Sequence, residues 1–438
     1  MANERLTAVL VLLVGGIVIQ GQAPPVDPMA KVAERYVKLV LAVGQHDADY
    51  VDAFYGPPAW KTEAEQLKTP LAAIDASAAA LEPEIGGVLV PGLKGAEAEL
   101  WDLRRQYLRR QLASLRSRVA MLQGKKMTFD EESLALYDAV APVKPESEFE
   151  LVLTLLEAKL PGDGPLIDRY DRFKQAFIIP KTRLDRVFKE AIRACRQRTT
   201  STTVDLPLNE RFSVEYVTGK SWSGYNWYQG DFKSLIQVNT DLPIYIDRAI
   251  DLACHEGYPG HHVYNVLLEK HLVKQRGWME YTVYPLFSPQ SLIAEGTANY
   301  GIEVAFPMAS RVLFERDVLF PIAGLDPMRV GEYYTVLDLV DRLSYAGNEA
   351  ARRYLNGEID RAGAIAFLEK YAMYTTPRAE QRVKFIEQYR SYVINYNLGK
   401  DLVRAYIEKR MGREKTPFRR WREFTALLSS PRLPSGLK

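Results

Sequence analysis

The sequence HEGYPGHH, which begins at His255, contains the residue types of a zinc hydrolase in an unusual arrangement. In the H-E-x-x-H motif, two histidines one helical turn apart bind zinc and the glutamate acts as a base. His255 and Glu256 match its first two positions, but Pro259 stands where the second histidine would be, and His261 and His262 follow. The segment is a broken zinc site, a rearranged one, or a helix with histidines for other reasons.

The distribution of histidines favours a metal site. The chain has five histidines, and four of them, His255, His261, His262 and His271, fall within 17 residues. Histidine is the commonest metal ligand, and helix propensity does not favour such clustering. A set of unrelated surface or core histidines is the alternative.

A straight helix cannot bring these histidines to one ion. Side chains four residues apart lie about 40° apart around the axis and can share a metal, but His255 and His261 would lie about 120° apart, and His255 and His262 about 10.5 Å apart along the axis. Pro259 cannot donate a backbone hydrogen bond, and Gly260 permits unusual backbone angles. A bulge or break there would restore nearly one-turn geometry for His261. His261 is therefore the better ligand, and His262 is a supporting residue or the alternative ligand.

A catalytic zinc has three protein ligands and one position for water. Glu295 lies in the apolar helical stretch 292–306, where a buried carboxylate is costly unless it binds something. Glu303, two turns later on nearly the same face, is a supporting residue or the alternative ligand; both glutamates could also lie at the surface. Glu256 follows the first ligand and points elsewhere, which is the position of a general base. We expect Glu269 to be solvated.

Two further features would complete a hydrolytic site. No histidine follows His271, so a tyrosine or an arginine would have to stabilise the oxyanion. Tyr396 is our candidate, with Tyr392 and Arg390 nearby at helical spacing. The segment 234–239, SLIQVN, could form an edge strand that pairs with an extended substrate backbone.

The elements that must position these residues are mostly helical. Apolar residues recur at three- and four-residue steps in segments 30–43, 95–123, 148–160 and 182–197. Between about 208 and 240, short alternating segments with glycines predict a small antiparallel β-sheet. Helical periodicity then resumes and continues nearly to the end. We predict a mainly α protein with one small antiparallel sheet directly before the metal-binding helix.

The first residues differ from the rest. The apolar run 6–20 is shorter than the roughly 20 residues that a spanning helix needs. Residues 1–23 are therefore a signal peptide or an N-terminal anchor, with a buried helix as the third alternative. We predict one continuous catalytic domain after them, in which 24–207 is the helical N-terminal part and 208–438 contains the small sheet and the helical metal-site region.

Composition excludes some classes of partner. The chain is 47% hydrophobic and 26% charged, with a net charge of +2, so it is an ordinary globular protein without an electrostatic case for nucleic acid. Cys195 and Cys254 are the only cysteines. They could form one bridge in an exported protein, but a domain of this size does not need one, and we expect Cys254 to be a small buried apolar residue.

The chain resembles the bacterial family called domain of unknown function 885. Its members carry H-E-x-x-P-G-H-H, E-G-x-A-x-Y-x-x-E and Tyr-x-x-Gly segments. The matching residues are His255, Glu256, Pro259, Gly260, His261, His262, Glu295, Gly296, Ala298, Tyr300, Glu303, Tyr396 and Gly399. The family resembles helical zinc peptidases with a glutamate ligand, which implies a zincin-like multi-helical domain with a deep cleft. The chain departs from the family pattern at 391–395, SYVIN, and at 344–354, where members have a Pro-Gly pair and a histidine segment.

We predict an exported hydrolase, periplasmic or extracellular, with one Zn²⁺ bound by His255, His261 and Glu295. It would be a metallopeptidase that cleaves short peptides, with Glu256 as general base and Tyr396 as oxyanion donor. The alternatives are a non-catalytic metal- or peptide-binding protein and a hydrolase of a non-peptide amide. Expected partners are a peptide or small amide substrate and no nucleic acid, with membrane contact only through an uncleaved N-terminal anchor.

Overall fold

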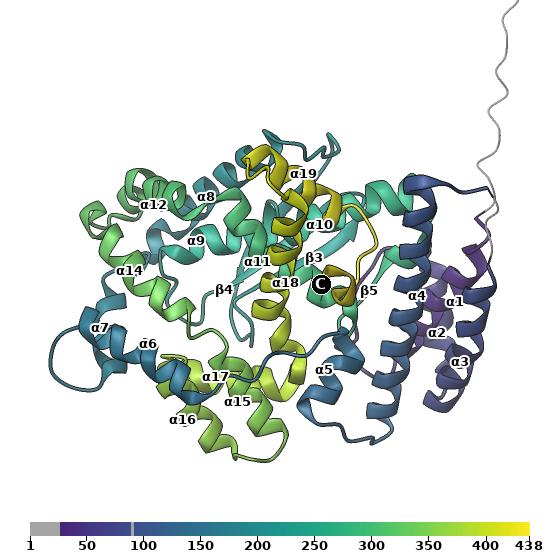
Figure 1. The fold of residues 1–438 in the computed structure, drawn as a ribbon, viewed down its shortest axis with the longest axis horizontal. Coiled ribbons are helices and arrows are strands. Elements are labelled where there is room, and N and C mark those ends of the chain that lie inside the picture. The colour runs from purple at the N-terminus through teal and green to yellow at the C-terminus, as the bar shows by residue number, and fades with distance from the viewer. Residues whose placement is uncertain (1–26, 89–91) are drawn as a thin grey trace, which may run out of the picture.

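The computed structural model describes residues 27–88 and 92–438 (Figure 1). The predicted signal peptide or anchor, residues 1–23, lies outside the described residues. Across the described ranges, no helix combines the length and the apolar character that a membrane crossing requires. The fold is mainly α-helical with small sheets, as predicted.

Helices from the N-terminal part pack together on one side of the molecule (Figure 1). They are α1 (Ala30–Val43), α2 (Pro58–Leu67), α3 (Leu71–Gly87), α4 (Gly95–Leu122) and α5 (Phe129–Tyr137). The apolar periodicity of α1 explains its packing, because Tyr36, Val37 and Val40 are fully buried. Thr128 caps α5 by accepting a hydrogen bond from the Glu131 backbone, and the Glu131 carboxylate accepts one from the Thr128 backbone.

A second group of helices surrounds its own apolar core at the opposite side of the molecule (Figure 1). It consists of α6 (Glu146–Lys159), α7 (Leu166–Gln175), α14 (Val330–Asp341), α15 (Ala346–Leu355), α16 (Arg361–Tyr371) and α17 (Thr376–Tyr389). Side chains such as Leu156, Leu343 and Leu368 are buried there. The larger core contains side chains from Met29 to Leu437 and so joins the two ends of the described chain.

The remaining α-helices belong to neither group. They are α8 (Leu184–Thr200), α9 (Asp247–Leu252), α10 (His261–Leu268), α11 (Pro289–Ala305), α12 (Met308–Phe314), α13 (Phe320–Ala323), α18 (Ile394–Met411) and α19 (Pro417–Leu428). Helices α11 and α18 cross in close contact at Gly296 and Gly399. A methyl group at Gly296 would come within 2.5 Å of the Gly399 backbone, so only glycine permits this approach.

The predicted sheet is present, but its strand directions differ from the prediction. Strands β2 (Arg211–Val217) and β3 (Gly224–Gly230) flank β4 (Lys233–Asn239), and β4 is antiparallel to β3 but parallel to β2. The prediction of an antiparallel sheet was therefore wrong for β2. Alternating side chains predict a strand without specifying its direction.

The central place of β4 also changes the substrate-binding prediction. Segment 234–239 lies within β4, and both edges of β4 are already paired, so it cannot add a substrate strand. A second sheet, which the sequence did not indicate, pairs β1 (Val51–Phe54) with β5 (Val283–Pro285) in antiparallel fashion. These strands are only 4 and 3 residues long, too short to give a clear alternation.

The two cysteines form the disulfide bond that the sequence left open, and Cys254 is buried as expected. Cys195 on α8 is bonded to Cys254, the residue before His255, and both side chains are fully buried. The two residues are 59 positions apart in the chain. The bond ties α8 directly to the histidine segment.

Candidate metal centre

The helix that carries His255 is interrupted before His261. A π-helical turn, Ala253–Gly257, follows α9, three non-helical residues come next, and α10 begins at His261. The Gly260 backbone donates to the carbonyl of Cys254 at 2.8 Å. A methyl group at Gly260 would lie 1.8 Å from the His255 carbonyl oxygen, which only glycine avoids. The break lies at the Pro-Gly pair that the sequence singled out.

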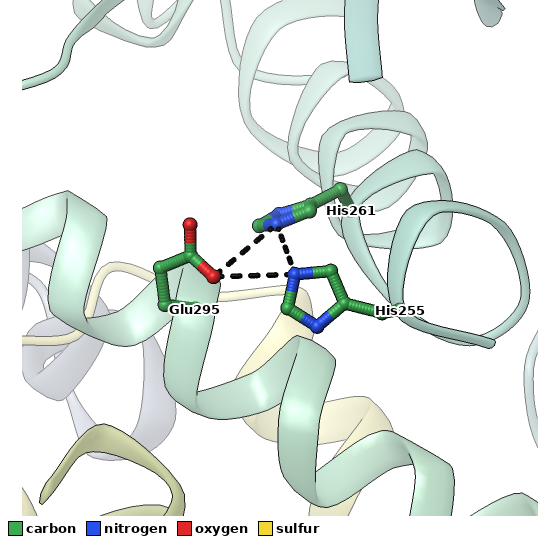
Figure 2. A group of neighbouring side chains, drawn as sticks. All are labelled: His255, His261 and Glu295. Carbon is green, nitrogen blue, oxygen red and sulfur yellow. Dashed lines mark hydrogen bonds and ion pairs between the residues drawn. The ribbon is translucent and has the colours of Figure 1, made fainter. Parts of the chain in front are cut away.

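This break brings three predicted ligands together (Figure 2). The Nε2 atoms of His255 and His261 are 3.1 Å apart. Oε2 of Glu295, from α11, lies 3.2 Å from Nε2 of His255 and 3.6 Å from Nε2 of His261. All three ligand atoms lie within 4.8 Å of one another. The three side chains therefore converge on one point from three segments: the turn after α9, α10 and α11.

The chemistry of this group fits a small divalent cation. Ligand atoms bound tetrahedrally to zinc lie about 3.4 Å apart, close to the three distances here. Among the described residues, Oε2 of Glu295 is buried without a hydrogen-bond partner. Burial opposes ionisation of Glu295, but His261 and His255 hold its pKa well below the ordinary value. A buried charged oxygen without a donor is costly, and a cation between the three ligands would remove that cost.

Two residues behind the ligands orient them. Oδ1 of Asn299 lies 3.1 Å from Nδ1 of His255, and its Nδ2 donates to the Tyr396 carbonyl at 3.2 Å. The hydroxyl of Tyr392 donates to Oε1 of Glu295 at 2.8 Å. Asn299 was not predicted from the sequence, although it lies one helical turn after Glu295. Tyr392 was predicted only as a neighbour of Tyr396.

Glu256 and Tyr396 line the cleft beside the three ligands. Glu256 is buried, and burial raises its pKa although His255 and His261 act in the opposite direction. Its backbone carbonyl accepts a hydrogen bond from the Asn226 side chain at 2.7 Å. Burial, together with the charge of Glu295, raises the pKa of Tyr396 well above its ordinary value. Tyr396 therefore keeps its proton and can donate a hydrogen bond.

The two alternative ligands are engaged elsewhere. Nε2 of His262 lies 3.0 Å from a carboxylate oxygen of Glu210, and its Nδ1 lies 2.9 Å from the Ser234 hydroxyl on β4. His262 is fully buried between the helix and the sheet. Glu303 forms ion pairs with Lys400 and Arg404. The structure thus places His261 and Glu295, rather than His262 and Glu303, beside His255.

Glu269 is not the solvated residue that the sequence suggested. It is buried, and its carboxylate accepts hydrogen bonds from the backbone N–H groups of Asp231 and Phe232 at 3.1 and 3.2 Å. The Tyr228 hydroxyl also donates to it. Asp231 and Phe232 form the turn between β3 and β4 and both have positive φ angles. Glu269 therefore holds this turn in place.

The three ligands open onto a cleft of about 1480 Å³. Its lining comes from both ends of the chain, including Asp52 on β1 and Tyr225 on β3, whose side chains are hydrogen-bonded to each other. Burial raises the pKa of Asp52 to about 6. Neither residue belongs to a motif, and Asp52 is some 200 positions from the histidines, so the sequence gave no signal for them.

Comparisons with known proteins identify a shared fold but no family. No model of a known protein family matches the chain, and no curated protein sequence matches it. A protein of Colwellia psychrerythraea described as a lipoprotein has a similar structure, with 13% sequence identity and a TM-score of 0.52, over 86% of this chain and 70% of that one. The similarity to the Colwellia psychrerythraea protein concerns the fold alone. The resemblance to domain of unknown function 885 stays a prediction.

Two other solved structures show weaker similarity. A structure described as BsuCP has 11% identity and a TM-score of 0.47, over 92% of this chain and 88% of that one. The M32 carboxypeptidase from Deinococcus radiodurans R1 has 14% identity and a TM-score of 0.41, over 91% and 89%. Neither value is high enough to transfer a function.

Proposed function

We propose that the protein is a zinc-dependent hydrolase that cleaves amide bonds of short peptides. The observation that carries this proposal is the convergence of His255, His261 and Glu295 on one point, beside a large cleft and next to a buried glutamate. Three ligands leave one position for water, whereas structural zinc sites have four protein ligands. A structural or purely metal-binding role is therefore the weaker alternative.

The neighbouring residues have the chemistry that hydrolysis needs. Zinc bound at such a site would lower the pKa of water and polarise a carbonyl group. Glu256 would accept the proton of the attacking water and return it to the leaving amine. Tyr396 would donate a hydrogen bond to the oxyanion that develops on the carbonyl, a role that its high pKa supports.

Export from the cytoplasm is part of the proposal. The Cys195–Cys254 disulfide supports it, because such bonds persist in oxidising compartments and are rare in the cytosol. The predicted signal peptide or anchor, residues 1–23, agrees with this location. A fractionation experiment that follows the full-length chain would decide between release and anchoring.

The deciding experiment combines metal analysis with a peptide-library cleavage assay. The purified protein is expected to contain about one zinc per chain. Glu256→Gln should keep the metal and lower turnover by about 100- to 10,000-fold, because it removes only the base. Retained turnover in Glu256→Gln would refute the mechanism.

Matched histidine and glutamate variants test the ligand set. His255→Ala and Glu295→Ala should lose zinc, and His271→Ala should keep it, because His271 is partly exposed and its Nδ1 is hydrogen-bonded to Gln275. Zinc content that is the same in all three variants would exclude the proposed ligands. A protein with full zinc content that cleaves non-peptide amides but no peptide would favour the alternative substrate class.

A further inference from the structure

One face of α17 forms a wall of the cleft. Its cleft-lining side chains are Arg378, Gln381, Arg382, Phe385, Gln388 and Tyr389, which recur at three- and four-residue steps. This face belongs to the second group of helices, whereas the metal ligands come from α10, α11 and the turn after α9. The wall is therefore formed by a helix that carries none of the three ligands.

Several basic residues of this cleft form ion pairs, whereas Arg382 does not. Arg248 and Arg311 form ion pairs with Asp251 at 3.0 and 2.7 Å, and Lys400 pairs with Glu303 at 2.9 Å. Arg382 has no carboxylate within ion-pairing distance in the part of the chain that the structure describes. Its Nε atom is buried there without a hydrogen-bond partner. Arginine stays protonated in proteins, so this is a charged donor group without an internal acceptor.

Aromatic side chains hold the Arg382 guanidinium in place. Its central carbon lies 4.8 Å from the ring centre of Phe385 and 5.8 Å from that of Tyr396. Arginine can stack the flat face of its guanidinium on an aromatic ring, which leaves the N–H groups at its edge available. Those N–H groups form the planar fork that binds a carboxylate through two parallel hydrogen bonds. The side chain is thus fixed in position before a ligand arrives.

The same contacts relate Arg382 to the metal ligands. The rings of Tyr396 and Tyr392 pack with centres 5.8 Å apart, and the Tyr392 hydroxyl donates to Glu295. Two aromatic side chains therefore connect Arg382 with a ligand residue. A group bound at Arg382 would therefore lie close to Tyr396, the expected oxyanion donor on α18.

We propose that Arg382 binds a carboxylate of the substrate, so that the site selects peptides with a carboxylate on the residue beside the scissile bond. This inference rests on the proposed peptidase function and adds a substrate class to it. The carboxylate has two chemical sources, the free C-terminus of the peptide and an acidic side chain. Cleavage next to a free C-terminus would make the enzyme act from the end of its substrate.

The test measures binding separately from turnover. Three peptides of equal length are titrated calorimetrically into the full-length Glu256→Gln protein: an N-acylated peptide with a free C-terminus, its C-terminal amide, and an amide with glutamate as the last residue. A carboxylate bound by Arg382 should tighten binding about 10- to 100-fold over the plain amide. If the free acid alone binds tightly, the carboxylate bound by Arg382 is the peptide C-terminus. If the glutamate amide binds equally tightly, Arg382 binds the acidic side chain.

Variants of Arg382 attribute this preference to one residue. Arg382→Gln should bind all three peptides with the weaker affinity of the amide, and Arg382→Lys, which keeps the charge without the planar fork, should be intermediate. Arg420→Gln is the matched control. Arg420 also lines the cleft and has a buried Nε without a hydrogen-bond partner, but its charge influences Tyr300 instead of Tyr396. It should retain the wild-type preference.

The outcomes separate this inference from the proposed function. Unchanged preference in Arg382→Gln, with a circular dichroism spectrum like that of the parent, would overturn the carboxylate assignment. So would equal affinity of the parent for all three peptides. The proposed function fails on a different result, namely zinc-loaded wild-type protein that hydrolyses none of the peptides, whatever their affinities.

Discussion

Oδ1 of Asn299 lies 3.1 Å from Nδ1 of His255 and fixes the orientation of that imidazole. With Nδ1 directed at the amide, Nε2 of His255 faces His261 and Glu295. The Asn299 amide also donates to the Tyr396 carbonyl. One side chain on α11 thereby orients a predicted metal ligand and connects it to α18.

We predict that Asn299→Ala lowers zinc affinity by about 10- to 100-fold, because residues that orient a ligating histidine contribute to metal binding on this scale. Asn299→Asp keeps an oxygen acceptor for His255 and should retain most of the affinity. Competition with a chromogenic chelator measures both constants. Equal affinity in wild type and Asn299→Ala would show that the ring is oriented by other contacts.

The close crossing of α11 and α18 gives a stability prediction. A methyl group at Gly399 would come within 2.8 Å of the Leu292 carbonyl oxygen and 3.0 Å of Gly296. We expect Gly399→Ala to lower the free energy of unfolding by about 1–3 kcal/mol. Urea denaturation followed by circular dichroism measures this effect.

Gly331→Ala is the control for that substitution. Gly331 lies in the first turn of α14, and nothing would come within 4 Å of an added methyl group. There the higher helix propensity of alanine should leave stability unchanged or raise it by up to about 1 kcal/mol. Equal effects at the two positions would mean that helix propensity, and not the crossing, decides the result.

Local signals in the sequence were sufficient for part of this site. The break before His261 follows from Pro259 and Gly260, whose effects on a helix act over a few residues. The apolar surroundings of Glu295 pointed to a buried carboxylate, and Glu295 is buried. The helical content also follows from periodicity, which each segment carries by itself.

Features that depend on distant contacts could not be predicted in this way. The parallel pairing of β2 with β4 and the bond between Cys195 and Cys254 both depend on how separate segments meet. The same holds for Asp52 in the cleft. Burial of Glu269 was missed because its partners are the backbone groups of a turn on another element.

The buried pair of Glu210 and His262 gives a pH-dependence prediction. Burial raises the pKa of Glu210, but hydrogen bonds from His262, Arg196 and Tyr258 outweigh it and lower the pKa to about 2. A carboxyl group whose pKa is depressed on folding stabilises the protein above its ordinary pKa, and this contribution is lost as the pH falls toward 2.

Glu210→Gln isolates that contribution. The difference in unfolding free energy between wild type and variant should be largest at pH 7 and should shrink between about pH 4.5 and pH 3, measured by urea denaturation at each pH. A difference that stays constant over this range would show that the carboxylate charge contributes nothing and that the variant merely repacks.

The disulfide next to His255 gives the last prediction. Cys195 and Cys254 close a loop of 59 residues, and a cross-link of this length stabilises a folded chain by about 4 kcal/mol in the chain-entropy model. The double variant Cys195→Ala, Cys254→Ala should lose about that much stability. Because the bond also ties α8 to the residue before a ligand, we expect weaker zinc binding in the same variant. Treatment with a reductant should lower the stability of wild type but leave that of the double variant unchanged. If the reductant destabilises both proteins equally, the effect does not come from this disulfide bond.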